Sequence, residues 1–198
     1  EYKDDDIIVN GEHFVVFSKG LGADGLCFKG NQRNIENNLY VRTLMAQGVF
    51  DKLAKLKYKV LTGTEVGNTD VPLLLCGETY GDVQDLTYGG GAKFRAFDLA
   101  VGYRGSRAWC SRSLTQQYVT QVGIDYVPVL YVGPFSDQVL EQYTNGKETV
   151  SGKQLHIREG VVVTTEPERN VADLGRVILK SVSAAYLLRK SSNATEYQ

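Results

Sequence analysis

Cysteine is scarce in this 198-residue sequence, and neither sign of charge dominates it. The three cysteines, Cys27, Cys76 and Cys110, are scattered and lack the spacing of a metal-binding motif. We therefore interpret them as small buried side chains of a protein from a reducing compartment. The formal net charge is -1, which gives no overall attraction to nucleic acid. A nucleic-acid partner would have to bind a local basic face.

Long apolar runs are also missing. No run is long enough to span a bilayer, and the acidic start, Asp4 to Asp6, is unlike a signal peptide. We therefore expect no membrane contact and a cytoplasmic protein, or a nuclear one in a eukaryote. Internal repeats and low-complexity linkers are absent too, so residues 1–198 are expected to form a single domain.

Short apolar runs between glycine-containing turns predict strands, and stretches with helical spacing predict helices between them. Asn10-Gly11 is a strong hairpin signal between Ile7–Val9 and Phe14–Phe17. Interleaved elements of this kind predict an α+β fold with antiparallel sheets flanked by helices. Further strands are expected at 26–28, 71–76, 94–101, 129–132, 158–164 and 176–179, and helices at 34–56 and behind Ser113, Ser136 and Ser183.

Four short blocks place charged residues at the end of apolar runs or inside them. Lys, Glu, Arg and Asp are rarely buried without a partner, so four such interruptions suggest charges that converge on a common ligand. The blocks are Gly77-Glu78-Thr79-Tyr80-Gly81, Phe94-Arg95-Ala96-Phe97-Asp98, Arg158-Glu159-Gly160-Val161-Val162-Val163 and Arg176-Val177-Ile178-Leu179-Lys180.

This ordered set resembles the motifs of covalent nucleotidyltransferases, and most closely those of ATP-dependent RNA ligases. The phrases Ser18-Lys19-Gly20-Leu21-Gly22, Asn38-Leu39-Tyr40-Val41-Arg42 and Leu179-Lys180-Ser181-Val182-Ser183 resemble the nick-sealing branch, whose members carry an N-terminal OB module. The likeness runs from about Phe14 to about Lys190. It implies a nucleotidyltransferase (ATP-grasp-like ligase) domain in which the four blocks line an ATP pocket.

The resemblance places Lys180 and Glu159 nearest the chemistry, as catalytic residues. Lys180 would contact the α-phosphate of ATP, and Glu159 would be a ligand of the catalytic Mg2+ or Mn2+. A lysine at the end of a strand can reach a phosphate, and a carboxylate before Gly160 suits a strand end that faces a metal. The same residues also fit a lysine that snorkels into solvent and a surface pair between Glu159 and Arg158.

Three further residues complete the ATP site that the resemblance implies. Glu78 would accept a hydrogen bond from the ribose, Phe97 would stack on adenine, and Lys19 would lie near AMP and the nick. Taken alone, Glu78 is a carboxylate beside a turn, Phe97 a core aromatic and Lys19 a lysine at the end of a hairpin. Asp98 would point to the face opposite Phe97 if the strand is regular.

The sequence departs from the family pattern at the nucleophile. Family members attack ATP with a lysine in a Lys-x-Asp-Gly block, and the pKa of that lysine must fall for it to react. The nearest copy, Lys3-Asp4-Asp5-Asp6, lacks the glycine, and its acids would raise the pKa of Lys3. We therefore expect the nucleophile, and the OB module, to lie upstream of Glu1, with Lys3 as the alternative.

A second departure concerns the last block, where many family members have two lysines one residue apart. Here Lys180 stands alone, and Val182 lies two positions on. Either one lysine suffices, or Arg176 shares the contacts with phosphate.

Together these features predict the catalytic domain of an ATP-dependent RNA ligase that seals 3′-OH and 5′-phosphate ends through lysyl-AMP and AMP-capped RNA. ATP, Mg2+ or Mn2+, and nicked or broken RNA, including RNA within an RNA/DNA duplex, are the expected ligands of a monomer. A DNA ligase or a capping enzyme shares the four blocks. A module that binds nucleotide or nicks without chemistry would explain the missing lysine block.

Overall fold

A computed structural model of the chain describes residues 6–19, 26–62, 71–82 and 86–189. The described helices are α1 (Gln32–Asn37), α2 (Leu39–Ala46), α3 (Val49–Thr62), α4 (Arg112–Gln121), α5 (Asp137–Thr144) and α6 (Ala184–Leu187). None of these helices has the length and apolar character needed to cross a membrane.

The described strands pair only into antiparallel sheets of two or three strands. The pairs are β1–β2, β3–β4, β8–β11 and β9–β10, and the largest sheet has the order β5-β6-β7. The strands are β1 (Ile7–Val9), β2 (Glu12–Phe14), β3 (Val16–Phe17), β4 (Cys27–Phe28), β5 (Leu73–Tyr80), β6 (Lys93–Val101), β7 (Ala108–Trp109), β8 (Gly160–Thr164), β9 (Asn170–Val171), β10 (Gly175–Arg176) and β11 (Ile178–Val182).

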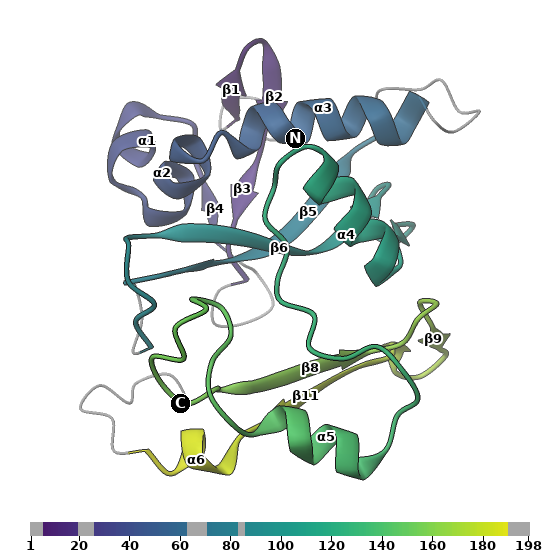
Figure 1. The fold of residues 1–198 in the computed structure, drawn as a ribbon. Coiled ribbons are helices and arrows are strands. Elements are labelled where there is room, and N and C mark those ends of the chain that lie inside the picture. Colours follow the sequence, from purple (N-terminus) through teal and green to yellow (C-terminus); the bar gives the residue numbers. More distant parts are fainter. Residues whose placement is uncertain (1–5, 20–25, 63–70, 83–85, 190–198) are drawn as a thin grey trace.

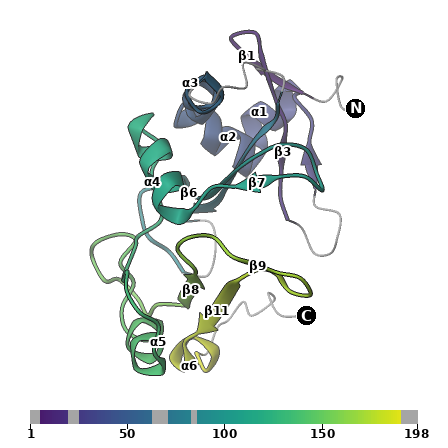
Figure 2. The ribbon, with the colours of Figure 1, turned by 90° about the vertical axis from the view of Figure 1, so that its right-hand side faces the viewer.

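The two longest sheets lie one above the other between helices (Figures 1 and 2). We call the part from β1 to α4 the N-terminal half and the part from α5 to α6 the C-terminal half. Helices α1 to α4 lie with the β5–β6–β7 sheet in the N-terminal half. Helices α5 and α6 lie beyond the β8–β11 sheet in the C-terminal half. This arrangement agrees with the predicted α+β fold of antiparallel sheets flanked by helices.

Both clusters of buried apolar side chains found in the described residues belong to the N-terminal half. The larger packs α3 and α4 against β6 through side chains such as Leu56, Phe94 and Val119, and the smaller joins Ile7 and Phe50. Burial of this kind is the main stabilising contribution in folding. In the C-terminal half, hydrogen bonds of Arg158 and Glu148 fix the segment between α5 and β8.

A bulge changes the phase of β6 in the middle of its pairing with β5. Cys76 lies opposite Asp98 and Gly77 opposite Ala96, so Phe97 has no partner across the pair. Ala96 and Leu99 both belong to the cluster beneath the helices, and the bulge therefore leaves Phe97 and Asp98 together outside it. The prediction that Asp98 points away from the face of Phe97 is wrong, because it assumed a regular strand.

Several predicted elements agree with the structure. Asn10 and Gly11 have φ angles of 52° and 83° and join β1 to β2, as the hairpin signal predicted. Ser136 caps α5, and its side chain accepts a hydrogen bond from the Val139 N–H. Ser183 stands at the N-cap of α6, although its side chain makes no capping bond.

Other predictions are corrected. The region 34–56 forms three helices instead of one, because Asn31 and Asn38 cap α1 and α2 separately. Helix α4 is capped by Ser111 rather than Ser113. The expected strand 129–132 is irregular backbone. The three cysteines are not all buried, since Cys27 is exposed and Cys76 and Cys110 are half-buried.

Candidate active site

Glu159 and Lys180 form an ion pair on the β8–β11 sheet. The Lys180 Nζ lies 2.7 Å from Glu159 Oε1, and a bond of 2.7 Å from the Ser183 N–H to the Glu159 carbonyl extends the ladder to this residue. A Cβ on Gly160 would lie 2.0 Å from the Ser181 carbonyl oxygen. Glycine therefore permits the close backbone approach that keeps Glu159 beside Lys180.

Lys180 projects from the face of this sheet that is turned away from α5. The Thr144 hydroxyl of α5 donates to Ser181 at 2.7 Å, and neighbouring residues of a strand point to opposite faces. Val162 lies opposite Lys180 in the ladder and shares its face. Because α5 covers the other side, this face is turned toward the β5–β6 sheet (Figure 1).

Glu78 projects from β5 toward the same space from the other side. Its neighbour Thr79 is buried opposite Phe94 of the core, whereas Glu78 lies opposite Arg95. Arg95 Nη2 donates to the Val150 carbonyl of the C-terminal half at 3.2 Å, so the face that holds Arg95 and Glu78 is turned toward that half. Strand β5 runs to Tyr80, and Glu78 therefore lies inside a strand instead of after one.

Carboxylates from both sheets act on the ionisation of Tyr88. Burial raises its pKa to about 12, and the negative charges of Glu148, Glu159 and Glu78 add to this effect. The Tyr88 ring packs edge-on against His156 at 4.7 Å between centroids. Glu78 and Glu159, distant in sequence, therefore lie close enough to one phenol to act on its ionisation.

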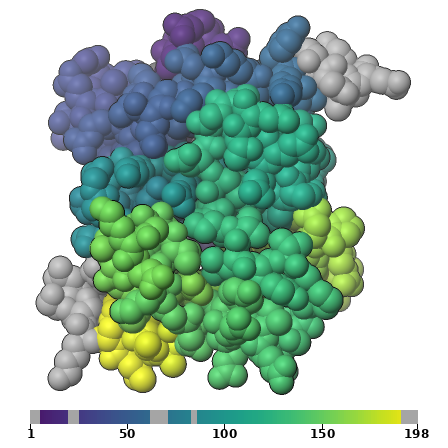
Figure 3. All heavy atoms as spheres, viewed as in Figure 1, coloured from purple at the N-terminus to yellow at the C-terminus, as the bar shows by residue number. Residues whose placement is uncertain are grey.

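The segment that leads to Glu159 is held by a buried carboxylate. Glu148 is 2% exposed and accepts hydrogen bonds from Ser151 N–H at 2.8 Å and Leu155 N–H at 3.0 Å. Burial raises the pKa of the Glu148 carboxyl, but these hydrogen bonds outweigh it and leave the pKa below its ordinary value. On the face shown in Figure 3, this segment after α5 lies against the N-terminal half.

Arg158 does not form the surface pair with Glu159 that the sequence left open. Its guanidinium donates to the carbonyls of Tyr143 at 2.5 Å, Lys147 at 2.9 Å and Asn145 at 3.2 Å. These bonds satisfy carbonyls in the last turn of α5 and in the segment that directly follows it. Arg158 thus fixes the start of β8, and Glu159 faces Lys180 instead.

Phe97 is half-buried at the bulge and is not part of the apolar cluster described for β6. Its carbonyl accepts hydrogen bonds from Arg112 and from the Tyr126 hydroxyl. The backbone is therefore held in place while the ring lies outside the main core.

Three further predicted residues are Lys19, Lys3 and Arg176. Lys19 is exposed after β3, and the next described residue is Leu26. Lys3 lies outside the described residues. Arg176 is bound to the carboxylates of Asp98 and Glu168.

Sequence reasoning missed Tyr88 and His156. Neither lies in one of the four blocks, and Tyr88 directly precedes Gly89, whose N–H donates to Asp82, as does the N–H of Gly91. The aspartate and the glycines were a usable signal for a turn. Nothing in the sequence indicated that Tyr88 would reach His156.

Comparison with known proteins places the chain in a family. The profile of the RNA ligase family matches residues 6–182. The chain belongs to the RNA ligase family. No curated protein and no solved structure matches it. Membership of the RNA ligase family indicates a ligase-type function, with RNA as the class of substrate.

A titration of Tyr88 tests whether the two sheets of this RNA ligase family member meet as described. We expect the ultraviolet difference titration between the wild type and Tyr88→Phe to have its midpoint at about pH 12. Removing a nearby negative charge favours the phenolate, so Glu159→Gln and Glu78→Gln should each lower that midpoint. Because the ordinary pKa is 10.0, the stability that Tyr88 contributes is complete below pH 10 and is lost toward pH 12.

Glu141→Gln provides the control for this titration, because Glu141 is an exposed carboxylate of α5. It should leave the midpoint unchanged. A midpoint that responds equally to all three substitutions, or to none, would show that Glu78 and Glu159 do not converge on Tyr88.

Proposed function

We propose that this chain is the adenylyltransferase part of an ATP-dependent RNA ligase of the nick-sealing branch. The observation that carries the proposal is the ion pair of Lys180 and Glu159, 2.7 Å apart, on a sheet that faces the side of β5 and β6 that holds Glu78 and Arg95. In the proposed reaction a lysine nitrogen attacks the α-phosphorus of ATP and pyrophosphate leaves. AMP then passes to an RNA 5′-phosphate, and a 3′-OH displaces AMP as the phosphodiester forms.

The Glu159–Lys180 pair has the charges that a metal-bound triphosphate requires. Mg2+ in phosphoryl-transfer sites is commonly held by one or two carboxylates together with substrate phosphates and water. Glu159 would supply a carboxylate of this kind, and the nucleotide would supply the phosphate oxygens. Bound there, Mg2+ or Mn2+ would neutralise phosphate charge. Side-chain exposures of 56% for Lys180 and 39% for Glu159 leave both within reach of a ligand.

Apolar surface is present for the base of the nucleotide. Val162 is 61% exposed on the face of Lys180, and the half-buried ring of Phe97 lies outside the main apolar cluster. An aromatic face and a branched side chain suit a purine ring. Glu78, on the opposing sheet, would accept a hydrogen bond from the ribose.

The nucleophile of this proposed reaction is a lysine N-terminal to Glu1, or else Lys3. We also propose that an OB module accompanies the domain, that Lys19 approaches AMP at the nick, and that the ligase acts as a monomer in the cytoplasm, or in the nucleus of a eukaryote. Nicked or broken RNA is the proposed substrate.

Substitution of Lys180 tests the proposed phosphate site. We expect Lys180→Ala to weaken ATP binding about 10- to 100-fold, because a hydrogen bond to a charged group contributes about 1.5–3 kcal/mol. Glu159→Gln should abolish the gain in ATP affinity that Mg2+ gives the wild type over a chelator. Isothermal titration calorimetry with and without Mg2+ measures both effects, and sealing by the full-length protein should be lost in both variants.

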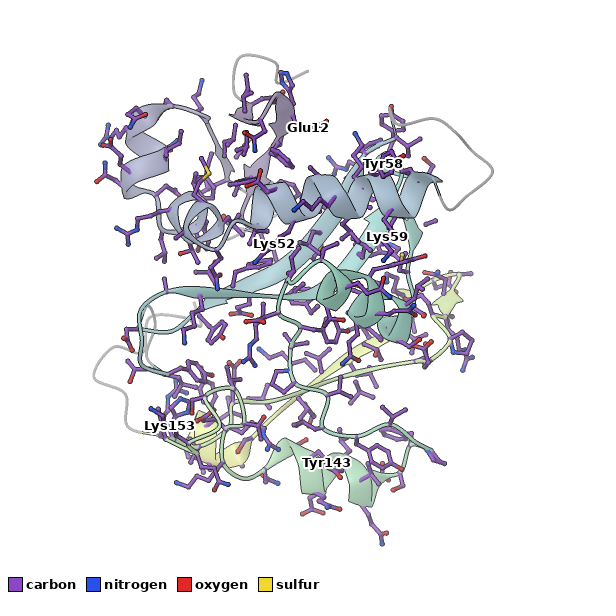
Figure 4. All side chains as sticks on the ribbon, turned by 45° about the horizontal axis from the view of Figure 1, so that its top comes forward. Glu12, Lys52, Tyr58, Lys59, Tyr143 and Lys153 are labelled. Carbon is purple, nitrogen blue, oxygen red and sulfur yellow. The ribbon has the colours of Figure 1, made fainter. Side chains whose placement is uncertain are left out.

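Lys153 provides a matched control, since it is an exposed lysine of the same half (Figure 4). Lys153→Ala should bind ATP like the wild type. An equal loss of ATP affinity in Lys153→Ala and Lys180→Ala would show that only the overall charge of the protein matters. Unchanged ATP binding by Lys180→Ala would remove Lys180 from the site.

Phe97→Leu separates an adenine platform from a core residue. Leucine keeps most of the apolar volume but lacks the flat face, and stacking on a base contributes about 1–3 kcal/mol. We expect the variant to bind ATP about tenfold more weakly or worse, with a nearly unchanged melting temperature. Phe94→Leu should do the reverse, because Phe94 is buried in the helix-facing core. Weak ATP binding by Phe94→Leu and normal binding by Phe97→Leu would exchange the two roles.

A further inference from the structure

A buried ion network joins the two halves of the chain beside the candidate site. Asp98, on β6, is 4% exposed. Arg176, on β10, donates to both of its oxygens, from Nη1 at 2.7 Å and from Nη2 at 2.9 Å. Arg112, at the start of α4, lies 3.1 Å from the same carboxylate. A buried carboxylate of this kind requires both charge partners and hydrogen bonds.

The guanidinium of Arg176 is almost fully engaged by protein groups. Its Nε and Nη2 donate to Glu168 at 2.7 Å and 2.9 Å. Its Cζ lies over the Trp109 ring, 3.9 Å from the ring centre. Four of its five N–H donors therefore have carboxylate partners. Such a group is a fixed joint between elements and is poorly placed to bind a phosphate as well.

A second contact strengthens this joint at the start of α4. Glu166 of the C-terminal half accepts hydrogen bonds from the Ser113 N–H at 3.2 Å and from the Ser113 hydroxyl at 3.0 Å. A carboxylate at this end of a helix is favoured by the helix dipole. Glu166 and Arg176 thus hold the same edge of the N-terminal half.

The contact between Asp98 and Arg176 lies close in sequence to two residues of the proposed ATP site. Asp98 directly follows Phe97, and Arg176 precedes Lys180 by four residues on the strand path that enters β11. We propose that Asp98 and Arg176 form a positioning pair that sets the strand of Lys180 against the strand of Phe97 without touching the nucleotide. The pair thereby fixes the distance between the phosphate contact and the adenine contact, and this inference rests on the proposed ATP site.

The experiment compares ATP with adenosine, which lacks phosphate. Asp98→Asn and Arg176→Gln should each weaken ATP binding tenfold or more, because Lys180 shifts, while adenosine binding changes less than threefold. The double variant should bind ATP about as well as the more strongly affected single variant, since both substitutions break the same contact. Arg189→Gln is the control, because Arg189 also stacks on an aromatic ring, that of Tyr186, but within the C-terminal half.

Trp109, the single tryptophan of the chain, reports on the joint directly. Its fluorescence should shift to the red in both variants and stay unchanged in Arg189→Gln. If Arg176→Gln does not fold, Arg176→Lys keeps the charge but loses the two-pronged contact, and it should show the same split between ATP and adenosine.

Other outcomes would overturn the positioning pair. Normal or tighter ATP binding by Asp98→Asn, with loss only in Arg176→Gln, would show that Arg176 contacts phosphate directly. Parallel loss of adenosine and ATP would reduce the pair to a stability element. If the wild type binds ATP and both Asp98→Asn and Arg176→Gln bind it equally well, this inference alone is overturned. If the wild type binds no ATP, the proposed function is overturned together with the positioning pair.

Discussion

The buried charge of Asp98 is the constraint on which the arrangement of the two halves depends. A carboxylate that is 4% exposed needs cationic partners, and Arg112 comes from its own half while Arg176 comes from the other. Burial alone would lower the pKa of the Arg176 guanidinium, but hydrogen bonds and charges from Glu168 and Asp98 outweigh burial and raise it. Arg176 therefore stays charged, and its contact with Asp98 joins the two halves beside the candidate site.

Polar contacts also fix the segment of the C-terminal half that leads to the candidate site. Arg158 binds three carbonyls after and within α5, and Glu148 fixes the segment that leads to Glu159. Among the described residues, the clusters of buried apolar side chains belong to the N-terminal half. The strand of Lys180 thus takes its position from hydrogen bonds and from the contacts with the other half, and the geometry of the site is linked to that joint.

The sequence was most informative where local chemistry decides structure. The Asn10-Gly11 hairpin, the cap at Ser136 and strand β6 follow from turn preference, capping and apolar patterning, and the ordered blocks pointed to the RNA ligase family that the comparison confirms. The bulge at Phe97, the reach of Tyr88 to His156 and the pairing of Asp98 with Arg176 depend on contacts between distant segments. Spacing along a chain does not encode such contacts, and the two carboxylate partners of Arg176 could therefore not be predicted from the sequence.

Hydrogen–deuterium exchange of the chain with and without ATP and Mg2+ tests most directly whether the two facing sheets form one nucleotide site. The account predicts that ATP slows amide exchange both in β6 around Phe97 and in the segments around Glu159 and Lys180, with little change in α3 on the far side of the β5–β6 sheet (Figure 4). Protection confined to one sheet, or equal protection throughout the chain, would contradict a site shared between the halves.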